Sequence, residues 1–508
     1  MGNQATRVGH VSAKKADVVT HTGESANSAN NLSKSSSGTE LESNTHMQFL
    51  PIENLAKILS HQTHDEERIN GITASVFQRY LFPNYPELGE KLFNHLHHAA
   101  NVSTSYLSAN CFKQQAEKFL AVMNDQAVLE NYVKMYSDIK GDGNINPDGL
   151  KALLNISYDI FMSNSGLSSC IYKGQIIDSA VSSCVTFVNQ ILIDNVKSIL
   201  QFHGKNALSV SYVSNWIWQN CARVIYGPHR YIIHVLTTAY RNGNALLSKE
   251  QPQPHLLIPT PILEQPDFPC FPQVLLPMSY VWLLSSTLPE CYLQADNSPK
   301  DITHALIAKR MGNLCPRHWT LLYNSSEHGT GANRFLHHVL GYRGPTLLFI
   351  RTVSPNEDTS RPIYCICSAI EWRESHLYWG DEDTLGIELF PSYRIIEKGA
   401  KVLYLNTNIR GYPHGLRFGS NPRSPYINID ESFHSVSIAG APYPISSLEV
   451  WGCGDAKLRE RQLEIKKWQV KEAEKQRIVK LSASDWQDHP DRYLLELAGR
   501  ASYNESNK

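Results

Sequence analysis

The run Ser325 to His328 contains the side-chain types from which a hydrolase builds its active site. Within the segment NSSEHGTGANRF at 324–335, a serine could attack a substrate, Glu327 could orient a base, and a histidine could accept the proton. These groups would have to converge on one substrate atom. Successive residues point to opposite faces of a strand and about 100° apart on a helix, so adjacency predicts a turn and argues against catalysis.

A hydrolase remains the alternative for this region. It would use Ser325 or Ser326 as nucleophile and a histidine from elsewhere in the chain, such as His414, as base. Known triads are assembled from distant parts of a sequence, so this version needs the fold to bring the groups together. No Gly-x-x-x-x-Gly-Lys or His-Glu-x-x-His motif supports phosphoryl transfer or zinc proteolysis.

The residues around the run predict a structural role for it. A strand is expected to end near Tyr323, with a tight reversal at Gly329 and Gly331. A helix capped by Ser326 or Thr330 is expected to follow. Its apolar, inward-facing residues are Phe335, Leu336, Val339 and Leu340.

A second candidate site is a degenerate calcium loop in SDIKGDGNINPDGLKALL. Asp138, Asp142 and Asn144 fall at the first, fifth and seventh positions of an EF-hand loop. Lys140 stands at the third position, where its charge would repel a cation, and Gly149 replaces the bidentate glutamate. We therefore predict an EF-hand-like scaffold without bound calcium, and keep a calcium-responsive binding module as an alternative.

The cysteines do not predict a metal centre or a disulfide framework. Ten are scattered along the chain, as expected for reduced thiols in the cytosol. Cys365 and Cys367 would share one face of a strand, but no second pair lies nearby to complete a tetrahedral site. We predict no metal, no cofactor and no structural disulfide.

The start MGNQAT matches the pattern for N-myristoylation of Gly2. The polar segment 1–45 that contains it has too few large apolar residues to fold, so it is expected to be a disordered leader. One lipid chain binds a membrane weakly and reversibly, so a second membrane-bound contact would be needed. We expect a cytoplasmic protein held peripherally at a membrane surface through this lipid.

Charge and hydropathy exclude two classes of function. The formal net charge is -1 and the pI about 7.1, so no global electrostatic attraction to nucleic acid is expected. No apolar run approaches the roughly 18 residues needed for a membrane-spanning helix. A monomer without nucleic-acid binding is the expected state.

Residues 46–247 have a helical pattern. In CFKQQAEKFLAVM, the apolar residues Phe112, Ala116, Phe119 and Met123 recur at steps of three and four, as on one face of a helix. The degenerate calcium loop lies among such segments. The sequence therefore predicts an all-helical, EF-hand-like domain.

A proline-rich linker at 248–276 is predicted to separate this domain from a region of β type. Within 277–454 the segments are short, rich in aromatic and β-branched residues, and separated by Gly, Pro and Asn. The fold class is therefore predicted as α+β, with a two-sheet sandwich and flanking helices after the helical domain.

The extension 455–508 is predicted to be helical and mostly charged. Leu458, Ile465 and Trp468 form a narrow apolar stripe on KLRERQLEIKKWQVKEAEKQRIVK. So thin a stripe does not form a core, and it favours a surface for another protein. A second, short apolar helix is expected in WQDHPDRYLLELAGR.

Several motifs of the β region resemble TLDc domains. WTLLYNSSEHGTGANRF, GPTLLFI, YWGDEDTLGIELFP, LYLN, PHGLRFG and LEVWGCG occur in the order seen in that family, across roughly 277–453. The chain departs from the family at 413–420, where members usually read Pro-Asn-Gly-Leu-Gly-x-Gly-Gly and this sequence reads PHGLRFGS. Its surface loop is bulkier, which affects any contact that needs bare backbone.

The resemblance implies a non-enzymatic β-sandwich protein that binds the catalytic head of the vacuolar proton-pumping ATPase (V-ATPase) and is linked to oxidation resistance. The likeness is greatest to lysosome-associated members, which implies the cytosolic face of the lysosomal membrane and a link to the mTOR complex. The family-like segments and the charged helix supply the expected partner-binding residues. These are Glu327, His328, Gly329, Gly415, Phe418, Gly419, Ile465 and Trp468.

Overall fold

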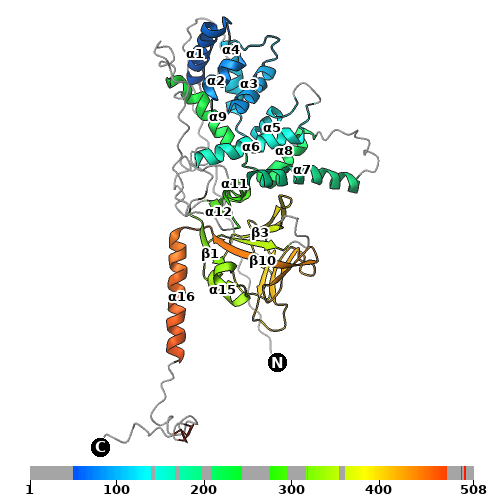
Figure 1. The fold of residues 1–508 in the computed structure, drawn as a ribbon, viewed down its shortest axis with the longest axis vertical. Helices are drawn as coiled ribbons and strands as arrows, with labels where there is room; N and C mark the ends of the chain where they lie inside the picture. The colour runs from blue at the N-terminus through cyan, green and yellow to red at the C-terminus, as the bar shows by residue number, and fades with distance from the viewer. Residues whose placement is uncertain are drawn as a thin grey trace, which may run out of the picture. The chain divides into compact units, whose positions relative to one another are not determined.

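The computed structural model confirms an α+β chain with helices first and an antiparallel sheet after them (Figure 1). Residues 49–508 form one compact unit. Gly2, its leader and most of the proline-rich linker lie outside the described residues. The described residues are 50–138, 143–165, 172–195, 208–242, 275–293, 316, 318–353, 361–477, 493–494 and 497–498.

The helical half consists of helix–loop–helix units joined in pairs. The helices of the first pair are α1 (Leu50–Glu67), α2 (Ala74–Leu81), α3 (Pro86–Ala100) and α4 (Ala109–Ala121). The loops of its two units meet in an antiparallel bridge, in which Ile72 and Leu107 exchange backbone hydrogen bonds of 2.7 and 3.0 Å. Both side chains are fully buried, so the bridge ties the two units through their loops.

The second pair repeats this arrangement. Its helices are α5 (Asp125–Met135), α6 (Pro147–Asn164), α7 (Lys173–Asn195) and α8 (Val210–Cys221), followed by α9 (Tyr226–Thr238) and the short η1 (Ala239–Asn242). Ile145 and Leu208 form the equivalent bridge, with both hydrogen bonds at 2.8 Å. Ile145 lies in the loop that the sequence identifies as a degenerate calcium site.

Helix α4 shows why the apolar spacing predicts helices here. Phe112, Ala116 and Phe119 are all buried on its inner face. Ser108 ends the preceding loop and caps the helix by accepting a hydrogen bond from the backbone of Cys111. Met123 does not extend the buried face as its spacing predicts, because the helix stops at Ala121 and the Met123 side chain is 66% exposed.

The sheet has ten antiparallel strands in the order β5-β4-β3-β2-β10-β9-β8-β7-β6, and β1 also pairs with β10. The strands are β1 (Thr320–Asn324), β2 (Thr346–Thr352), β3 (Ile363–Ser368), β4 (Leu385–Phe390), β5 (Arg394–Lys398), β6 (Leu403–Asn406), β7 (Gly415–Phe418), β8 (Ile427–Ile429), β9 (Ser435–Ile438) and β10 (Ala441–Gly452). Accompanying helices are α11 (Met278–Thr287), α12 (Glu290–Leu293), α14 (Ser325–His328), α15 (Ala332–Val339) and α16 (Ala456–Arg477).

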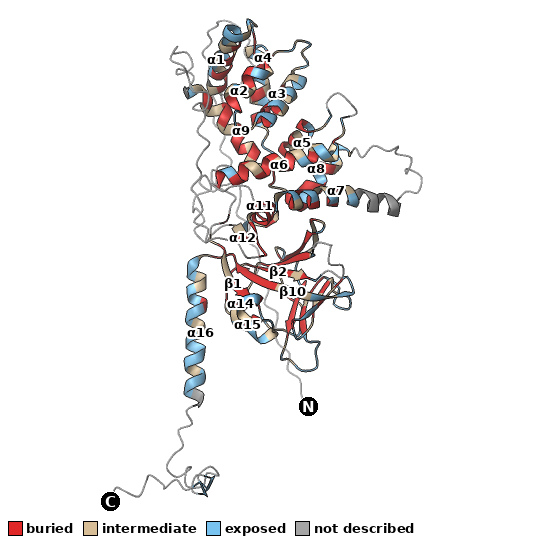
Figure 2. Ribbon diagram, in the orientation of Figure 1, coloured by how far each residue is buried: buried red, intermediate tan, exposed pale blue. Residues whose placement is uncertain are grey.

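Strands β2 to β4 are buried on both faces (Figure 2). Alternate residues such as Leu348 and Ile366 share one core with strands β6 to β9, so two layers enclose this core. The layers are not the two separate sheets that the sequence predicts, because β10 pairs with both β2 and β9 and joins them into one sheet. The residues between them, such as Phe349 and Ile387, belong to the core that also contains the helices. This double burial explains why these segments read as continuous apolar runs instead of alternating with polar residues.

The β4–β5 connection is held between helices of the N-terminal half and α11. Ser179 of α7 donates a hydrogen bond to the carbonyl oxygen of Leu389 at 3.2 Å. The side-chain oxygen of Asn220 in α8 accepts one from the backbone of Ile395 at 3.0 Å. Thr287 of α11 contacts the hydroxyl of Tyr393. The helical half therefore packs directly on the sheet within the compact unit.

Helix α16 is largely exposed over its length (Figure 2). It matches the predicted charged helix as far as Arg477. Most of the second predicted C-terminal helix lies outside the described residues. Among the described helices, none combines the length and the hydropathy that a membrane span requires.

Candidate partner-binding site

The Ser-Glu-His run forms a single helical turn, α14, directly after strand β1. The strand ends at Asn324, next to the predicted end at Tyr323. Ser325 is buried, and its Oγ accepts a hydrogen bond from the backbone nitrogen of Leu448 at 2.9 Å. The pairing of β1 with β10 ends at Asn324 opposite Glu449, so β1 offers no main-chain acceptor to Leu448. The serine hydroxyl supplies that acceptor instead.

His328 also makes local contacts. Its Nδ1 accepts a hydrogen bond from the backbone of Asn324 at 3.0 Å. The ring stacks on Tyr323 and lies 3.8 Å, centroid to centroid, from the ring of His338. Glu327 is exposed. The run therefore does not bring a serine, a carboxylate and an imidazole to one point. This agrees with the prediction that adjacent residues cannot converge on one substrate atom.

The distant histidine of the hydrolase alternative is placed elsewhere. His414 Nδ1 pairs with the carboxylate of Glu431 at 3.1 Å, at the end of the sheet formed by β7 and β8. The buried Ser325 hydroxyl is held by β10 instead. Within the described residues, neither Ser325 nor Ser326 forms a hydrogen bond with His414.

Helix α15 follows as predicted, but its cap differs. Phe335, Leu336 and Val339 are buried, which confirms the predicted inner face, and Leu340 is half-buried. The N-cap is Gly331, which has no side chain to accept a hydrogen bond. Neither Ser326 nor Thr330 caps this helix. Asn324 caps the preceding turn α14 instead, by accepting from the backbone of Ser326 at 2.9 Å.

The three glycines in the expected set have conformations that favour glycine. Gly329, Gly415 and Gly419 have φ angles of +79°, +109° and +145°. A side chain on Gly419 would also lie 2.7 Å from the backbone nitrogen of Tyr426. Phe418 between them is fully buried in the sandwich core. The backbone conformation of the expected binding loop thus explains why glycine stands at these positions, and Phe418 has no exposed surface for a partner.

Helix α16 is anchored at its start and free beyond it. Leu458 packs against the sandwich core. Gln462 is fully buried, and its amide nitrogen donates to the carbonyl oxygens of His338 and Leu340, both at 3.0 Å. These carbonyls belong to the last turn of α15, which lacks helical partners there. Farther along, Ile465 is half-exposed and Trp468 is 63% exposed.

The degenerate calcium loop is only partly described, because 139–142, including Lys140 and Asp142, lie outside the described residues. The backbone of Asp138 donates to the carbonyl of Asn144 at 2.9 Å. At Gly149, a Cβ atom would lie 2.5 Å from the carbonyl oxygen of Tyr136. The position that carries a glutamate in calcium-binding loops therefore has no room for one without movement of the backbone.

A pair of buried cysteines lies on the face of the sheet that packs on the helices. The sulfurs of Cys365 and Cys367 lie 3.7 Å apart, as predicted from their spacing, and burial raises the pKa of the Cys365 thiol.

A buried carboxylate lies on strand β10. Glu449 is 3% exposed, and both its oxygens accept from the backbone of Leu275 at 3.0 Å. Burial raises its pKa to about 7, against the opposing effect of hydrogen bonds from Leu275 and Trp451. Among the described residues, no group of three or more potential ligands is placed to hold a metal.

Sequence reasoning missed Gln462 and Glu449. Polar residues within a charged helix or a strand give no sign of burial, because their partners come from distant segments. A polar residue on the apolar stripe of α16, one turn after Leu458, is the only local signal for Gln462. Glu449 stands within LEVWG, an otherwise apolar strand, which marks it as unusual without naming its partner.

Residues 297–454 match the model of the TLDc domain, so the chain contains a TLDc domain. Among curated proteins, the chain is similar to those named Restriction of telomere capping protein 5. The protein from Leptosphaeria maculans is 23% identical, over 37% of this chain and 41% of its own length. The proteins from Pyricularia oryzae and Neurospora crassa are 24% and 23% identical, over 44% and 37% of this chain and 47% and 42% of theirs. The chain spans less than half the length of these relatives.

Proposed function

We propose, from its TLDc domain, that the chain is a non-enzymatic adaptor that binds the catalytic head of the V-ATPase. The proposal places it on the cytosolic face of the lysosomal membrane and links it to mTOR signalling and oxidation resistance. In these respects it would be similar to the mTOR-associated lysosomal TLDc protein. The family resemblance supports each of these points.

The single observation that carries the proposal is the form of α16. Its first two turns are fixed to the TLDc domain through Leu458 and Gln462, while Trp468 farther along is 63% exposed. An exposed tryptophan is a common anchor of protein interfaces. A helix with a rigid base and a free apolar side chain is suited to reaching a partner without unfolding the domain.

The helical half would act as a calcium-free, EF-hand-like scaffold. Paired helix–loop–helix units with one antiparallel bridge between their loops support this description, at Ile72 with Leu107 and at Ile145 with Leu208. The crowding at Gly149 supports the absence of a calcium ligand there. These helices then serve to cover and position the sheet.

Membrane attachment would come from a myristoyl group on Gly2 together with binding to the pump. Gly2 lies outside the described residues, so this part of the proposal rests on the MGNQAT start. A single myristoyl chain gives only marginal binding, and a second contact would make attachment stable. Intact mass and membrane fractionation of Gly2→Ala test this part: unchanged mass and distribution would exclude the lipid.

The decisive experiment is a pull-down from lysosomal membranes with the whole chain, with Trp468→Ala, and with Trp218→Ala. Trp218 is a matched control because it is also exposed, at 40%, but lies on α8. We expect pump subunits to co-purify with the whole chain and with Trp218→Ala. Recovery should fall about fivefold or more with Trp468→Ala, as for an interface anchor worth over 1 kcal/mol.

Two results would contradict the adaptor. One is the absence of pump subunits with the whole chain. The other is hydrolysis of activated esters by the purified protein that is lost when Ser325 and Ser326 are both changed to Ala in a folded variant, which would favour the hydrolase instead.

A further inference from the structure

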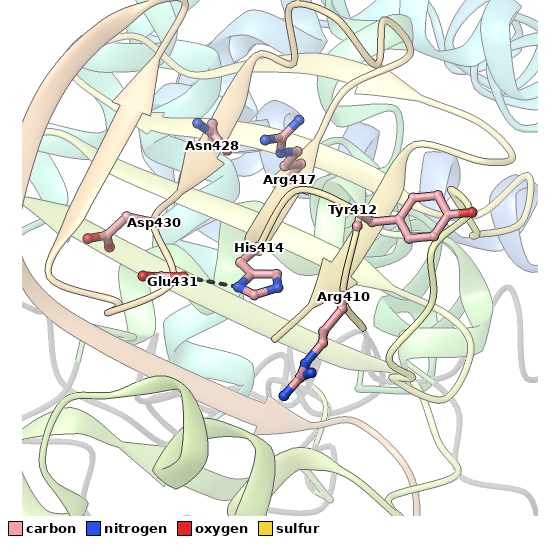
Figure 3. Close-up of a pocket in the computed structure, with 8 residues that line it drawn as sticks. Arg410, Tyr412, His414, Arg417, Asn428, Asp430 and Glu431 are labelled. Carbon is pink, nitrogen blue, oxygen red and sulfur yellow. Dashed lines mark hydrogen bonds and ion pairs between the residues drawn. The ribbon is translucent and has the colours of Figure 1, made fainter. Parts of the chain in front are cut away.

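The outer end of β7 and β8 contains an open cup of about 640 Å³ (Figure 3). Its lining includes Arg410, Tyr412, His414, Arg417 and Glu431. The rim residues are exposed and Arg417 on the floor is half-buried. A cup this open suits side chains presented by another chain better than a small molecule that must be enclosed.

Arg417 belongs to a polar row across the outer face of the sheet. It lies opposite Tyr404 of β6 and Asn428 of β8, while its neighbours Leu416 and Phe418 point into the core. The guanidinium lies 5.8 Å from the centroid of the Tyr404 ring. Its Nε atom is buried and has no hydrogen-bond partner among the described residues. The buried Nε cannot itself reach a ligand, but the guanidinium on the floor of the cup is half-buried and pairs with no carboxylate in the described part of the chain.

The carboxylates near the cup are already engaged. Asp430 accepts hydrogen bonds from the backbones of His434 and Ser435 at 3.0 and 3.1 Å, and these bonds help to keep its pKa lowered in spite of partial burial. Glu431 pairs with His414. Arg410 is exposed and forms no ion pair within the described part of the chain. The groups left to meet a ligand are thus the two arginines.

The loop that carries Arg410 and Tyr412 is fixed in place. Asn406 is fully buried, and its side chain accepts from the backbone of Ile409 at 2.8 Å and donates to the carbonyl of Pro413 at 3.2 Å. Tyr412 is 46% exposed and packs on the ring of His376. Little conformational entropy would be lost when this loop binds a ligand, because its backbone is already held.

We propose that this cup binds an acidic peptide segment of a partner protein. Carboxylate side chains at separate positions of the segment pair with Arg410 and Arg417, and the exposed ring of Tyr412 contacts the aliphatic part of the bound chain. Arg410 and Arg417 lie on opposite sides of His414 (Figure 3), so one small anion does not satisfy both, whereas a chain with spaced carboxylates does.

The cup is tested separately from the pump proposal, because that proposal is carried by Trp468 of α16 and the cup by Arg410 and Arg417 at the sheet end. The probe is a fluorescein-labelled hexaglutamate peptide, with hexalysine as the peptide of opposite charge. Binding is measured by fluorescence anisotropy at low salt, about 50 mM, where exposed charge pairs are least screened. The proteins are the whole chain, Arg410→Gln, Arg417→Gln, their double variant, and the matched control Arg423→Gln. Arg423 is also exposed and outside the cup.

We expect each single variant to weaken hexaglutamate binding about two- to fivefold, as for one exposed charge pair, and the double variant to multiply these losses. Arg423→Gln should bind as the whole chain does. Arg410 is outside the core, so its variant stays interpretable even if Arg417→Gln unfolds.

Three outcomes would overturn the proposal: equal affinity of the folded double variant, equal losses with Arg423→Gln, or hexalysine binding as tight as hexaglutamate. Competition by inorganic phosphate at the same molar concentration as the peptide would assign the cup to a small anion and also exclude the peptide.

Discussion

Ser325 stands beside a glutamate and a histidine, as a nucleophile would, but its hydroxyl serves the sheet. Strand β1 pairs with β10 as far as Asn324 opposite Glu449, and the chain then turns into α14. The next donor of β10, the backbone nitrogen of Leu448, would be left without an acceptor. The Ser325 hydroxyl takes that place at 2.9 Å. The serine in the Ser-Glu-His run thus has a structural explanation.

Replacing Ser325 with Ala should lower the free energy of unfolding by about 1–3 kcal/mol, because the buried backbone nitrogen of Leu448 loses the acceptor that the hydroxyl provides. The matched change Ser326→Ala should alter stability by less than about 0.5 kcal/mol, since Ser326 is exposed. Urea unfolding of both variants measures the difference. Equal stability of the two would show that the Ser325 hydroxyl does not support β10.

Glu449 should make stability depend on pH near neutrality. Its pKa of about 7 in the folded chain, against an ordinary value of 4.5, arises mainly from burial. The folded state therefore binds the proton more tightly than the unfolded state does. This contribution is full below pH 4.5 and is lost as pH rises through 7.

We expect Glu449 to make the chain about 1 kcal/mol less stable at pH 8 than at pH 6, relative to Glu449→Gln, which does not titrate. Glutamine retains one acceptor for the backbone of Leu275. Chemical unfolding of both proteins at the two pH values isolates this effect from other titrating groups. A constant difference between the two proteins would mean that Glu449 titrates outside this range.

At the scale of elements, α16 differs along its length, with a buried contact at Gln462 near its start and an exposed side chain at Trp468. From the sequence, Leu458, Ile465 and Trp468 form a thin apolar stripe, and the helix is predicted to be a binding surface more than part of the fold. The structure differs at its base, where Gln462 satisfies the carbonyls that end α15. This contact could not be predicted, because α15 lies more than a hundred residues earlier and nothing local identifies it.

Gln462→Ala should reduce the free energy of unfolding by about 1–3 kcal/mol, since it leaves buried carbonyls of α15 without a donor. Trp468→Ala should change it by less than about 0.5 kcal/mol, because that side chain is 63% exposed. Differential scanning fluorimetry and urea unfolding distinguish them. A larger loss with Trp468→Ala would mean that the far end of α16 packs on the body of the protein.

The calcium-like loop gives a prediction about the limits of repair. Sequence spacing alone suggests that Gly149→Glu would restore the missing ligand. The structure predicts failure, because the added Cβ would lie 2.5 Å from the Tyr136 carbonyl and 3.0 Å from the Asn146 side chain that caps α6. We expect lower stability and no calcium binding tighter than about millimolar by calorimetry. Micromolar binding by Gly149→Glu would show that the loop rearranges freely.

How far the sequence predicts these elements depends on the range of their contacts. Apolar spacing correctly identifies the inner face of α4 at Phe112, Ala116 and Phe119, because periodicity is a local signal. The spacing of Cys365 and Cys367 likewise predicts their shared face. Local sequence spacing does not identify the arginine cup. The residues that line it come from separate loops and strands, which the register of β7 and β8 brings together.

For the whole molecule, the helical half is a structural partner of the TLDc sheet. The face of β2 to β4 that points away from the sandwich core is apolar. It includes Leu347, Phe349, Ile387 and Leu389, all fully buried in the core shared with the helices. A sequence pattern of continuous apolar strands predicts burial on both faces but does not say what covers the second one. Here α7, α8 and α11 do so, with hydrogen bonds from Ser179 and Asn220 among the contacts.

The fragment 275–477, which lacks α1 to α9, should therefore be far less stable than the chain 49–477. Burial of one large aliphatic or aromatic side chain stabilises a protein by about 1.5–3 kcal/mol, and four such residues on this face would lose their cover. We expect the fragment's unfolding temperature to fall by more than about 10 °C, with strong binding of a hydrophobic dye at room temperature. Trp218→Ala, which changes an exposed side chain of α8, is the mild control, and should stay close to the intact chain. If the fragment unfolds cooperatively at the same temperature as the longer chain and binds no dye, the sheet is stable without its helices, and the helical half has a role other than covering it.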